Sequence, residues 1–325
     1  MKKIFILLMA SLVCVACSKK TAEEYFALAQ DYDNGTNGQN IDKAEAAKMY
    51  LTAAEMGHKE AQWETGHNYY WAEGVEQNYE EAVKWYRLSA EQGFYKAYNS
   101  LGACYHSGEG VAQSYEEAMK WYLLAAEQEH SRAYDNIGKL YQYGLGVAKD
   151  EKEAVKWYTL AAEKGDEYGQ YHLGNCYYWG TGVKKNYKQA VEWYLKAAEQ
   201  GNEYAEFRLG YCYGEGHGVK RDYKEAMKWY QKAAKKGNAA SINNIGVLYE
   251  YGRGVKKSYD KAFEYYLKAA KKGDDWGQHN VGWCYQYGKG TDKNRQEAIY
   301  WYKKAAEQGH KEAIKKLKKM GEYED

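Results

Sequence analysis

The sequence predicts an all-α solenoid of eight 36-residue helix-turn-helix repeats, closed by a C-terminal capping helix. Three observations predict this fold class. An aromatic pair recurs every 36 residues, glycines recur in the same register, and each copy contains two segments whose apolar residues have helical spacing. One pair of helices cannot bury its apolar face alone, so the copies are expected to stack on one another.

The aromatic pair marks the second helix of each copy. Within residues 114–128, Trp121 and Ala125 share one face of the expected helix. The aromatic pair of this segment is Trp121-Tyr122. The equivalent pairs in the other copies are Met49-Tyr50, Trp85-Tyr86, Trp157-Tyr158, Trp193-Tyr194, Trp229-Tyr230, Tyr265-Tyr266 and Trp301-Tyr302.

Glycines separate the helices. Those in loops such as "GEGVAQ" allow positive φ, so the first helix ends and the chain reverses. Glu129 replaces the glycine that usually follows the second helix, which predicts a cap weaker by about 1 kcal/mol. Gly102 and its equivalents lie inside the first helix, where glycine costs about 1 kcal/mol relative to alanine. We expect tyrosine and tryptophan rings of the adjoining copy to press onto this bare backbone.

The residues after position 17 are expected to form a single solenoid, 18–325. Its copies span about 21–56, 57–92, 93–128, 129–164, 165–200, 201–236, 237–272 and 273–308. Residues 309–322 begin a further first helix whose many lysines make it polar, which suits a terminal cap.

Residues 1–17 have the composition of a secretory signal. Two lysines precede an apolar run from residue 4 to residue 16, which is too short to span a bilayer. The run ends in "CVAC", which resembles a bacterial lipobox with Cys17 as the lipidated residue, and Ser18 is typical of outer-membrane lipoproteins. We therefore expect a bacterial envelope protein, anchored through Cys17 at the outer membrane. An ordinary cleaved signal and lipidation of Cys14 are the alternatives.

The charge balance argues against a nucleic-acid partner. The 46 Lys and Arg residues are matched by 45 Asp and Glu residues, so the chain lacks the basic face that nucleic acid requires. Membrane contact is expected through the lipid anchor alone.

The stretch "LGACYHSGEGVAQSYEEAMKWYLLAAEQ" resembles the Sel-one-like repeat (SLR) family, a relative of the tetratricopeptide repeat. The family pattern, L-G-x-x-Y-x-x-G-x-G-V followed by K/E-A-x-x-W-Y-x-x-A-A, covers residues 21 to about 320. The first copy departs from it at Ala29, Gln30 and Thr36. The resemblance implies a right-handed α/α superhelix that binds a protein or peptide. It implies neither catalytic residues nor a cofactor.

In such stacks the first helix of each pair lines the concave face, so its variable positions are the candidate partner-binding residues. Rings that differ among copies do not serve the shared packing, and rings with polar tips suit interfaces. We expect a groove for an extended segment, centred on Tyr171, Tyr178, Trp179, Phe207 and Tyr211. The remaining candidates are Trp63, Tyr70 and Trp283. The alternative is that these rings only pack between copies. Replacing Tyr178 and Tyr211 with alanine would then lower the melting temperature, which a binding role leaves unchanged.

Other chemistries find little support. Cys104, Cys176, Cys212 and Cys284 share a column with leucines and are expected to be buried. His172 and Cys176 are four residues apart on one helix, too few ligands for a metal site. No nucleophile stands with a base and an orienting acid. A glycan or peptidoglycan ligand on aromatic platforms is the second functional hypothesis, followed by a spacer without a partner and an enzyme.

Overall fold

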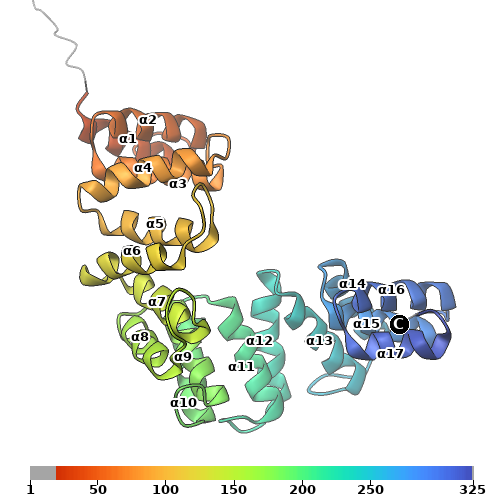
Figure 1. The fold of residues 1–325 in the computed structure, drawn as a ribbon. Helices are drawn as coiled ribbons and strands as arrows, with labels where there is room; N and C mark the ends of the chain where they lie inside the picture. Colours follow the sequence, from red (N-terminus) through yellow and green to blue (C-terminus); the bar gives the residue numbers. More distant parts are fainter. Residues whose placement is uncertain (1–19, 324–325) are drawn as a thin grey trace, which may run out of the picture. The chain divides into compact units, whose positions relative to one another are not determined.

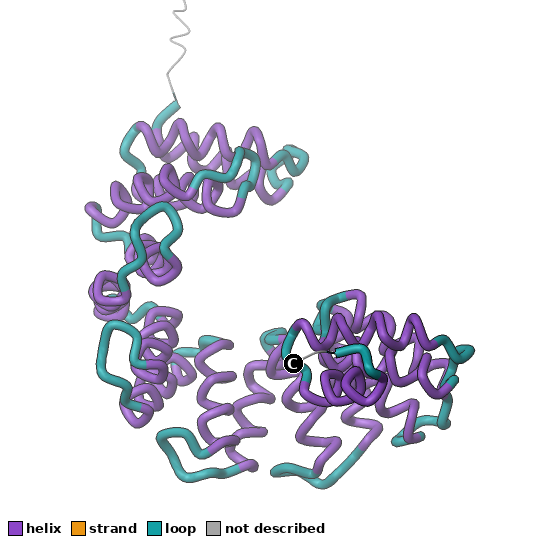
Figure 2. Tube along the Cα trace, turned by 45° about the vertical axis from the view of Figure 1, so that its right-hand side comes forward, coloured by secondary structure: helices purple, strands orange, loops and turns teal. Residues whose placement is uncertain are grey.

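The structure is a computed structural model that describes residues 20–323, a range that contains helices and no strands (Figures 1 and 2). The predicted signal sequence, with Cys17, lies outside the described residues. The chain divides within α6 into two compact units, one ending at Trp121 and one beginning at Tyr122. Each unit is a series of helical hairpins, which confirms the predicted all-α repeat fold.

The helices follow the predicted copies. The first unit contains α1 (Ala22–Asn34), α2 (Lys43–Glu55), α3 (Lys59–Trp71), α4 (Tyr79–Glu91), α5 (Tyr95–Ser107) and the first part of α6 (Tyr115–Glu127). The second unit continues with α7 (Ser131–Tyr143), α8 (Glu151–Glu163), α9 (Glu167–Trp179), α10 (Tyr187–Glu199), α11 (Glu203–Glu215), α12 (Tyr223–Lys235), α13 (Ala239–Tyr251), α14 (Tyr259–Lys271), α15 (Asp275–Tyr287), α16 (Arg295–Glu307) and α17 (Lys311–Met320). Odd-numbered helices are the first of each pair, and even-numbered helices are the second.

The hairpin of α9 and α10 shows how local sequence sets each turn. α9 ends at Gly180, whose φ of 77° lies in the left-handed region that glycine adopts without strain. Asn186 then caps α10 by accepting the backbone N–H groups of Lys188 and Gln189. At Glu129, where other copies have glycine, φ is 58°. Glu129 therefore adopts the left-handed conformation on which the prediction of a weaker cap rests.

Six of the hairpins are closed by a tyrosine ring on a glycine. A β-carbon added to Gly174 would come within 2.7 Å of Cδ1 of Tyr194. The equivalent pairs are Gly66–Tyr86, Gly138–Tyr158, Gly210–Tyr230, Gly246–Tyr266 and Gly282–Tyr302. The expectation that this ring comes from the adjoining copy was wrong, because both residues belong to one hairpin. The expectation that tryptophan rings also press onto these glycines was wrong as well. Adjacent residues on a helix point about 100° apart, so Tyr194 is buried whereas Trp193 is only partly buried.

Contacts between successive copies rely on small residues instead. A β-carbon added to Gly277 would lie 2.8 Å from Cβ of Ala269, on the second helix of the preceding copy. Gly169 faces Ala161 of the preceding copy in the same way. Small side chains on both sides allow the helices to approach closely and to pack at the density of a protein interior.

A polar link within the copies was not identified from the sequence. The Gln92 amide donates to Oε1 of Gln62 at 2.7 Å and to the carbonyl of Gly57 at 3.1 Å. The same arrangement recurs in two other copies, between Gln200 and Gln170 and between Gln308 and Gln278. In one copy Lys236 and Glu206 replace the two glutamines, with Nζ and Oε1 2.7 Å apart. In these four copies the buried glutamine or glutamate has a polar partner, and an unpaired buried polar group there would destabilise the fold.

The last helix, α17, covers the end of the second unit. Its Ala313 and Leu317 are buried with Tyr302 of α16, whereas Lys318 and Lys319 are exposed. This arrangement fits the predicted capping role. Among residues 20–323, no helix is both long enough and apolar enough to cross a bilayer.

Candidate functional site

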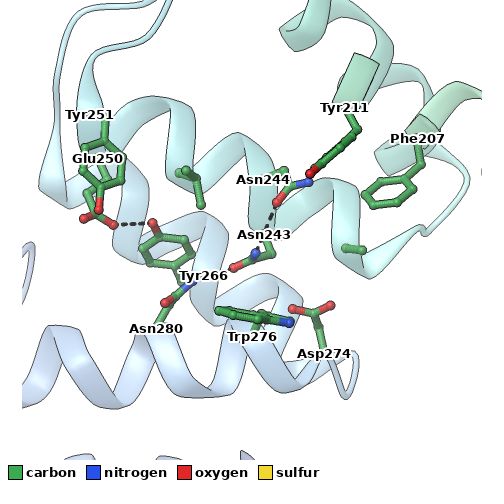
Figure 3. A pocket seen from close by; sticks show the side chains of 12 residues that line it. Phe207, Tyr211, Asn243, Asn244, Glu250, Tyr251, Tyr266, Asp274, Trp276 and Asn280 are labelled. Atoms are coloured by element: carbon green, nitrogen blue, oxygen red, sulfur yellow. Dashed lines mark hydrogen bonds between the residues drawn. The ribbon is translucent and has the colours of Figure 1, made fainter. Parts of the chain in front are cut away.

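The first helices of three successive copies surround a cavity in the second unit. It has a volume of about 470 Å³ (Figure 3), within the usual range of about 300–1,000 Å³ for ligand pockets. α11 contributes Phe207 and Tyr211, and α13 contributes Asn243, Asn244, Glu250 and Tyr251. α15 contributes Trp276 and Asn280, and Asp274 immediately precedes it.

Short side chains line the cavity at two positions that hold a pair of rings in two other copies. The equivalent ring pairs are Trp63–Phe94, with centroids 6.0 Å apart, and His279–His310, with centroids 4.8 Å apart. In the copy that forms the cavity these positions are Asn243 and Asp274. Ala240, also in the lining, adds little bulk. The open volume therefore follows from the side chains, since the hairpins themselves repeat.

Hydrogen bonds hold the polar lining in place. Asn280 donates through Nδ2 to Oδ1 of Asn243 at 2.9 Å, and Asn243 makes a longer contact of 3.5 Å with Asn244. The Tyr266 hydroxyl donates to Oε2 of Glu250 at 2.5 Å. Burial, reinforced by this bond to Glu250, raises the pKa of Tyr266, so the phenol remains protonated as a donor.

The formal charges of the lining are both negative. They belong to the carboxylates of Glu250 and Asp274. Among the described residues that line this cavity, none is a lysine or an arginine. Asp274 caps α15 by accepting the backbone N–H of Gly277 at 2.6 Å. The Asp274 carboxylate is partly removed from water, and this burial raises its pKa.

Three aromatic residues of the lining keep a large exposed surface. Trp276 is 55% exposed, Tyr251 is 58% exposed and Tyr211 is 36% exposed. Such rings offer area to a partner at a low cost in conformational entropy. The cavity therefore combines exposed rings, amides and carboxylates in one place.

The predicted site residues are distributed over several places. Phe207 and Tyr211 line the cavity. The others are Trp63 and Tyr70 on α3, Tyr171, Tyr178 and Trp179 on α9, and Trp283 on α15. Trp179 is 57% exposed and lies beside the Arg208 guanidinium, 5.7 Å from a ring centroid to Cζ.

Tyr178 does not belong to an exposed groove. It is 3% exposed, and its hydroxyl is 2.8 Å from Nδ1 of His217. Its ring packs against Tyr187, with centroids 4.9 Å apart. Tyr178 is therefore a packing residue, and an unchanged melting curve after its removal is no longer expected. The sequence could not show this, because His217 lies in the loop of the following copy.

Several other predicted rings also pack within the fold. Trp63 donates to Oγ of Ser100 at 3.0 Å, and the Tyr70 hydroxyl bonds to the Glu109 carboxylate. Partly buried Trp283 packs against a core cluster that α14 of the preceding copy forms with α15. Tyr171 packs against Tyr204, with centroids 5.7 Å apart.

Trp276 and Asp274 were missed by the sequence analysis, although a signal for them existed. Trp276 stands in a column that varies widely among copies, with Lys96, Arg132 and Ala240 at equivalent positions. The test of variability that selected the other rings would have selected Trp276. Asp274 belongs to a column of helix caps, so its role in the lining required the tertiary structure.

The cysteines and histidines offer no reactive centre in the described chain. Cys104, Cys176, Cys212 and Cys284 are buried as predicted, and burial raises the pKa of each thiol to about 12. At neutral pH these thiols are protonated and are poor nucleophiles. Nδ1 of His172 lies 2.6 Å from Oδ1 of Asp135. Within residues 20–323, no three His, Cys, Asp or Glu residues are grouped to hold a metal ion.

A family model and similar solved structures point to the same protein family. The Sel1 repeat family matches at residues 25–58, 59–94, 96–130, 131–166, 167–202, 203–238, 239–274 and 277–310. One similar structure is c5321, a protective antigen of uropathogenic Escherichia coli strains with an SLR fold; it is 35% identical, with a TM-score of 0.57, over 91% of this chain and 71% of that one. Another is a Sel1 repeat protein from Oxalobacter formigenes, 33% identical, with a TM-score of 0.68, over 75% of this chain and 96% of that one. No curated protein matches the chain.

Proposed function

The chain belongs to the Sel1 repeat family, and from this premise we propose that it holds an extended segment of a partner protein against the first helices of its second unit. Sel1 repeat proteins are generally non-enzymatic scaffolds for protein interactions. The observation that supports a particular location is the cavity between α11, α13 and α15, where Tyr211, Tyr251 and Trp276 are exposed.

Site-specific photo-crosslinking in the native envelope tests this proposal. Benzoylphenylalanine at position 276 or 251 should capture a partner, because both side chains lie at the cavity and are exposed. The matched control is position 300, an exposed tyrosine on α16 that does not line the cavity. Equal capture from positions 276 and 300 would contradict the proposed location, and no adduct from either cavity position would contradict a protein partner there.

We further propose that Cys17 anchors the protein to the bacterial outer membrane, on the sequence evidence alone. Metabolic labelling with an alkyne fatty acid should label the wild type and leave Cys17→Ser unlabelled, with the variant released from the membrane fraction. Cys14→Ser is the matched control and should keep its label. Loss of label from Cys14→Ser alone would reassign the lipidated residue.

A glycan is the second candidate, because exposed Trp276 lies near Asn280 and Asp274 in the same lining. Aromatic faces flanked by amides and carboxylates also suit sugar rings. Sedimentation of the purified protein with isolated cell wall separates this candidate from the first. Trp276→Ala should abolish co-sedimentation if the glycan is the ligand, and Tyr300→Ala should not.

A further inference from the structure

We propose that the cavity between α11, α13 and α15 is a receptor for one arginine side chain of the partner segment. This inference rests on the proposed function and names the chemistry of the segment. It is carried by charge, by exposed rings and by polar acceptors, all of which line the same cavity (Figure 3).

The charge of the cavity selects a cation. Glu250 and Asp274 both line it, and the adjoining hollow adds Glu215 and Arg253. The two linings together therefore carry three carboxylates and one guanidinium. Both carboxylates of the main cavity lie among rings and amides. Water therefore screens their attraction for a bound cation less than it would on an open surface.

The rings suit a guanidinium in particular. Arg253 already places its guanidinium carbon 4.9 Å from the centre of the Tyr251 ring, so a ring of this lining does accept such a group from the protein itself. Trp276, with the better face for a cation, is 55% exposed. A guanidinium is flat and weakly hydrated and can stack on such a face, whereas an ammonium group is a strongly hydrated point charge.

The acceptors match the donors of arginine. Oδ1 of Asp274 is used by the Gly277 N–H that it caps, which leaves Oδ2 for a ligand. Glu250 is held by the Tyr266 hydroxyl and supplies the second negative charge. A guanidinium carries five N–H donors in a fixed plane and keeps its charge at any physiological pH. It can therefore bond to one carboxylate and still face a ring.

The two carboxylates can be neutralised without removing their structural roles. Asp274→Asn keeps the cap, because Asn202 and Asn238 cap α11 and α13 through the same kind of bond, to Ala205 N at 2.9 Å and Ser241 N at 2.8 Å. Glu250→Gln keeps an oxygen acceptor for Tyr266. The matched control is Asp222→Asn, which removes a carboxylate from the exposed cap of α12.

A second variant fills the cavity with a ring pair that occurs at the equivalent positions of the next copy, and we call it the blocking variant. Asn243→His with Asp274→His would install the ring pair that His279 and His310 form in the next copy. Histidine can serve as the cap, since His310 accepts the Ala313 N–H through Nδ1 at 3.2 Å. This variant should fold and have the cavity filled.

Saturation-transfer NMR on the purified full-length protein tests the proposal. The probes are N-acetyl-arginine methylamide, its neutral isostere N-acetyl-citrulline methylamide, the corresponding lysine compound, and chitotriose. The arginine probe should bind most tightly, and the citrulline probe at least about tenfold more weakly, since it lacks the charge. Glu250→Gln with Asp274→Asn, and separately the blocking variant, should reduce arginine binding by at least about tenfold. Asp222→Asn should bind like the wild type.

Any one of the following competition or variant results would overturn the inference. They are equal binding of the arginine and citrulline probes, undiminished arginine binding by the carboxylate double variant, and displacement of the arginine probe by chitotriose. Absence of arginine binding, combined with a partner captured from position 276, would overturn the inference and leave the proposed function standing. Absence of both would overturn the two together. Circular dichroism melting of each variant establishes that a loss of binding is not a loss of fold.

Discussion

The ring of Tyr158 on α8 lies against the bare backbone of Gly138 on α7, so closely that a β-carbon on Gly138 would be 2.6 Å from Cε1 of the ring. The same contact closes five other hairpins. It sets the distance between the two helices of a hairpin, because a large flat ring and an absent side chain together leave one close-packed separation.

Gly138→Ala should destabilise the protein although alanine favours helices. Alanine in a helix ordinarily gains about 1 kcal/mol over glycine, but the added methyl must displace the Tyr158 ring, and such overpacking costs about 1–3 kcal/mol. The measurement is the free energy of unfolding in urea. Gly214→Ala is the matched control, because its added β-carbon would lie 3.9 Å from Cβ of Ala226. That change should be neutral or stabilising. A Gly138→Ala variant as stable as Gly214→Ala would contradict the proposed role of the ring.

Tyr178→Ala should lower the free energy of unfolding by about 3 kcal/mol, since it removes a buried ring and leaves a cavity. Tyr211→Ala removes a ring that is 36% exposed, so it should cost less than about 1 kcal/mol while weakening capture of the partner. Tyr178→Phe separates the hydroxyl from the ring and should cost about 1 kcal/mol through the lost bond to His217. Thermal and urea unfolding provide the measurements. Equal losses from Tyr178→Ala and Tyr211→Ala would be inconsistent with the observed burial.

Glu64 in the first unit should make stability fall as the pH rises through neutrality. Burial raises its pKa to about 7, an effect that Lys96 partly opposes and that Asp33 reinforces. The folded state therefore binds this proton more tightly than the unfolded state. The stabilisation is fully present below about pH 4.5 and is lost as the pH rises through 7.

Glu64→Gln removes this ionisation and keeps the shape of the side chain. The wild type should lose on the order of 1–2 kcal/mol more stability than Glu64→Gln between pH 5 and pH 8, as measured by urea unfolding at each pH. Glu80→Gln, which changes an exposed carboxylate on α4, is the control and should follow the wild type. Parallel pH profiles for wild type and Glu64→Gln would refute the assignment.

Glu129→Gly should stabilise the second unit by about 1 kcal/mol, because it relieves a left-handed conformation at a residue with a β-carbon. The change also removes an ion pair with Lys164, Nζ to Oε2 at 2.7 Å, but this pair is exposed and contributes little. Gly165→Ala makes the converse change at the equivalent position, where φ is 86° and no atom lies within 4 Å of the added carbon. It should destabilise by about 1 kcal/mol. The melting temperatures should shift in opposite directions.

Much of the fold could be predicted because its determinants are local and repeated. Glycine ends every first helix except α3, a short polar side chain starts most helices, and apolar spacing marks the buried faces, so helix positions and the all-α class follow from neighbouring residues. Burial of Cys104 and its equivalents followed from a column shared with leucine. The part of the site found in this way, Phe207 and Tyr211, consists of residues whose variation among copies is visible in the sequence.

What the sequence by itself determined is the repeating unit: two helices, their ends, and the repeated apolar positions that face inward. Only the tertiary structure decided that Tyr158 closes its own hairpin, that Tyr178 is buried beside His217, and that an open cavity lies beside Asn243 and Asp274. The physical reason is that a helix face is set within one segment, whereas a cavity is the volume left by side chains from three helices. The variation of residues at equivalent positions does not reveal which of them pack against a ring and which of them line a cavity.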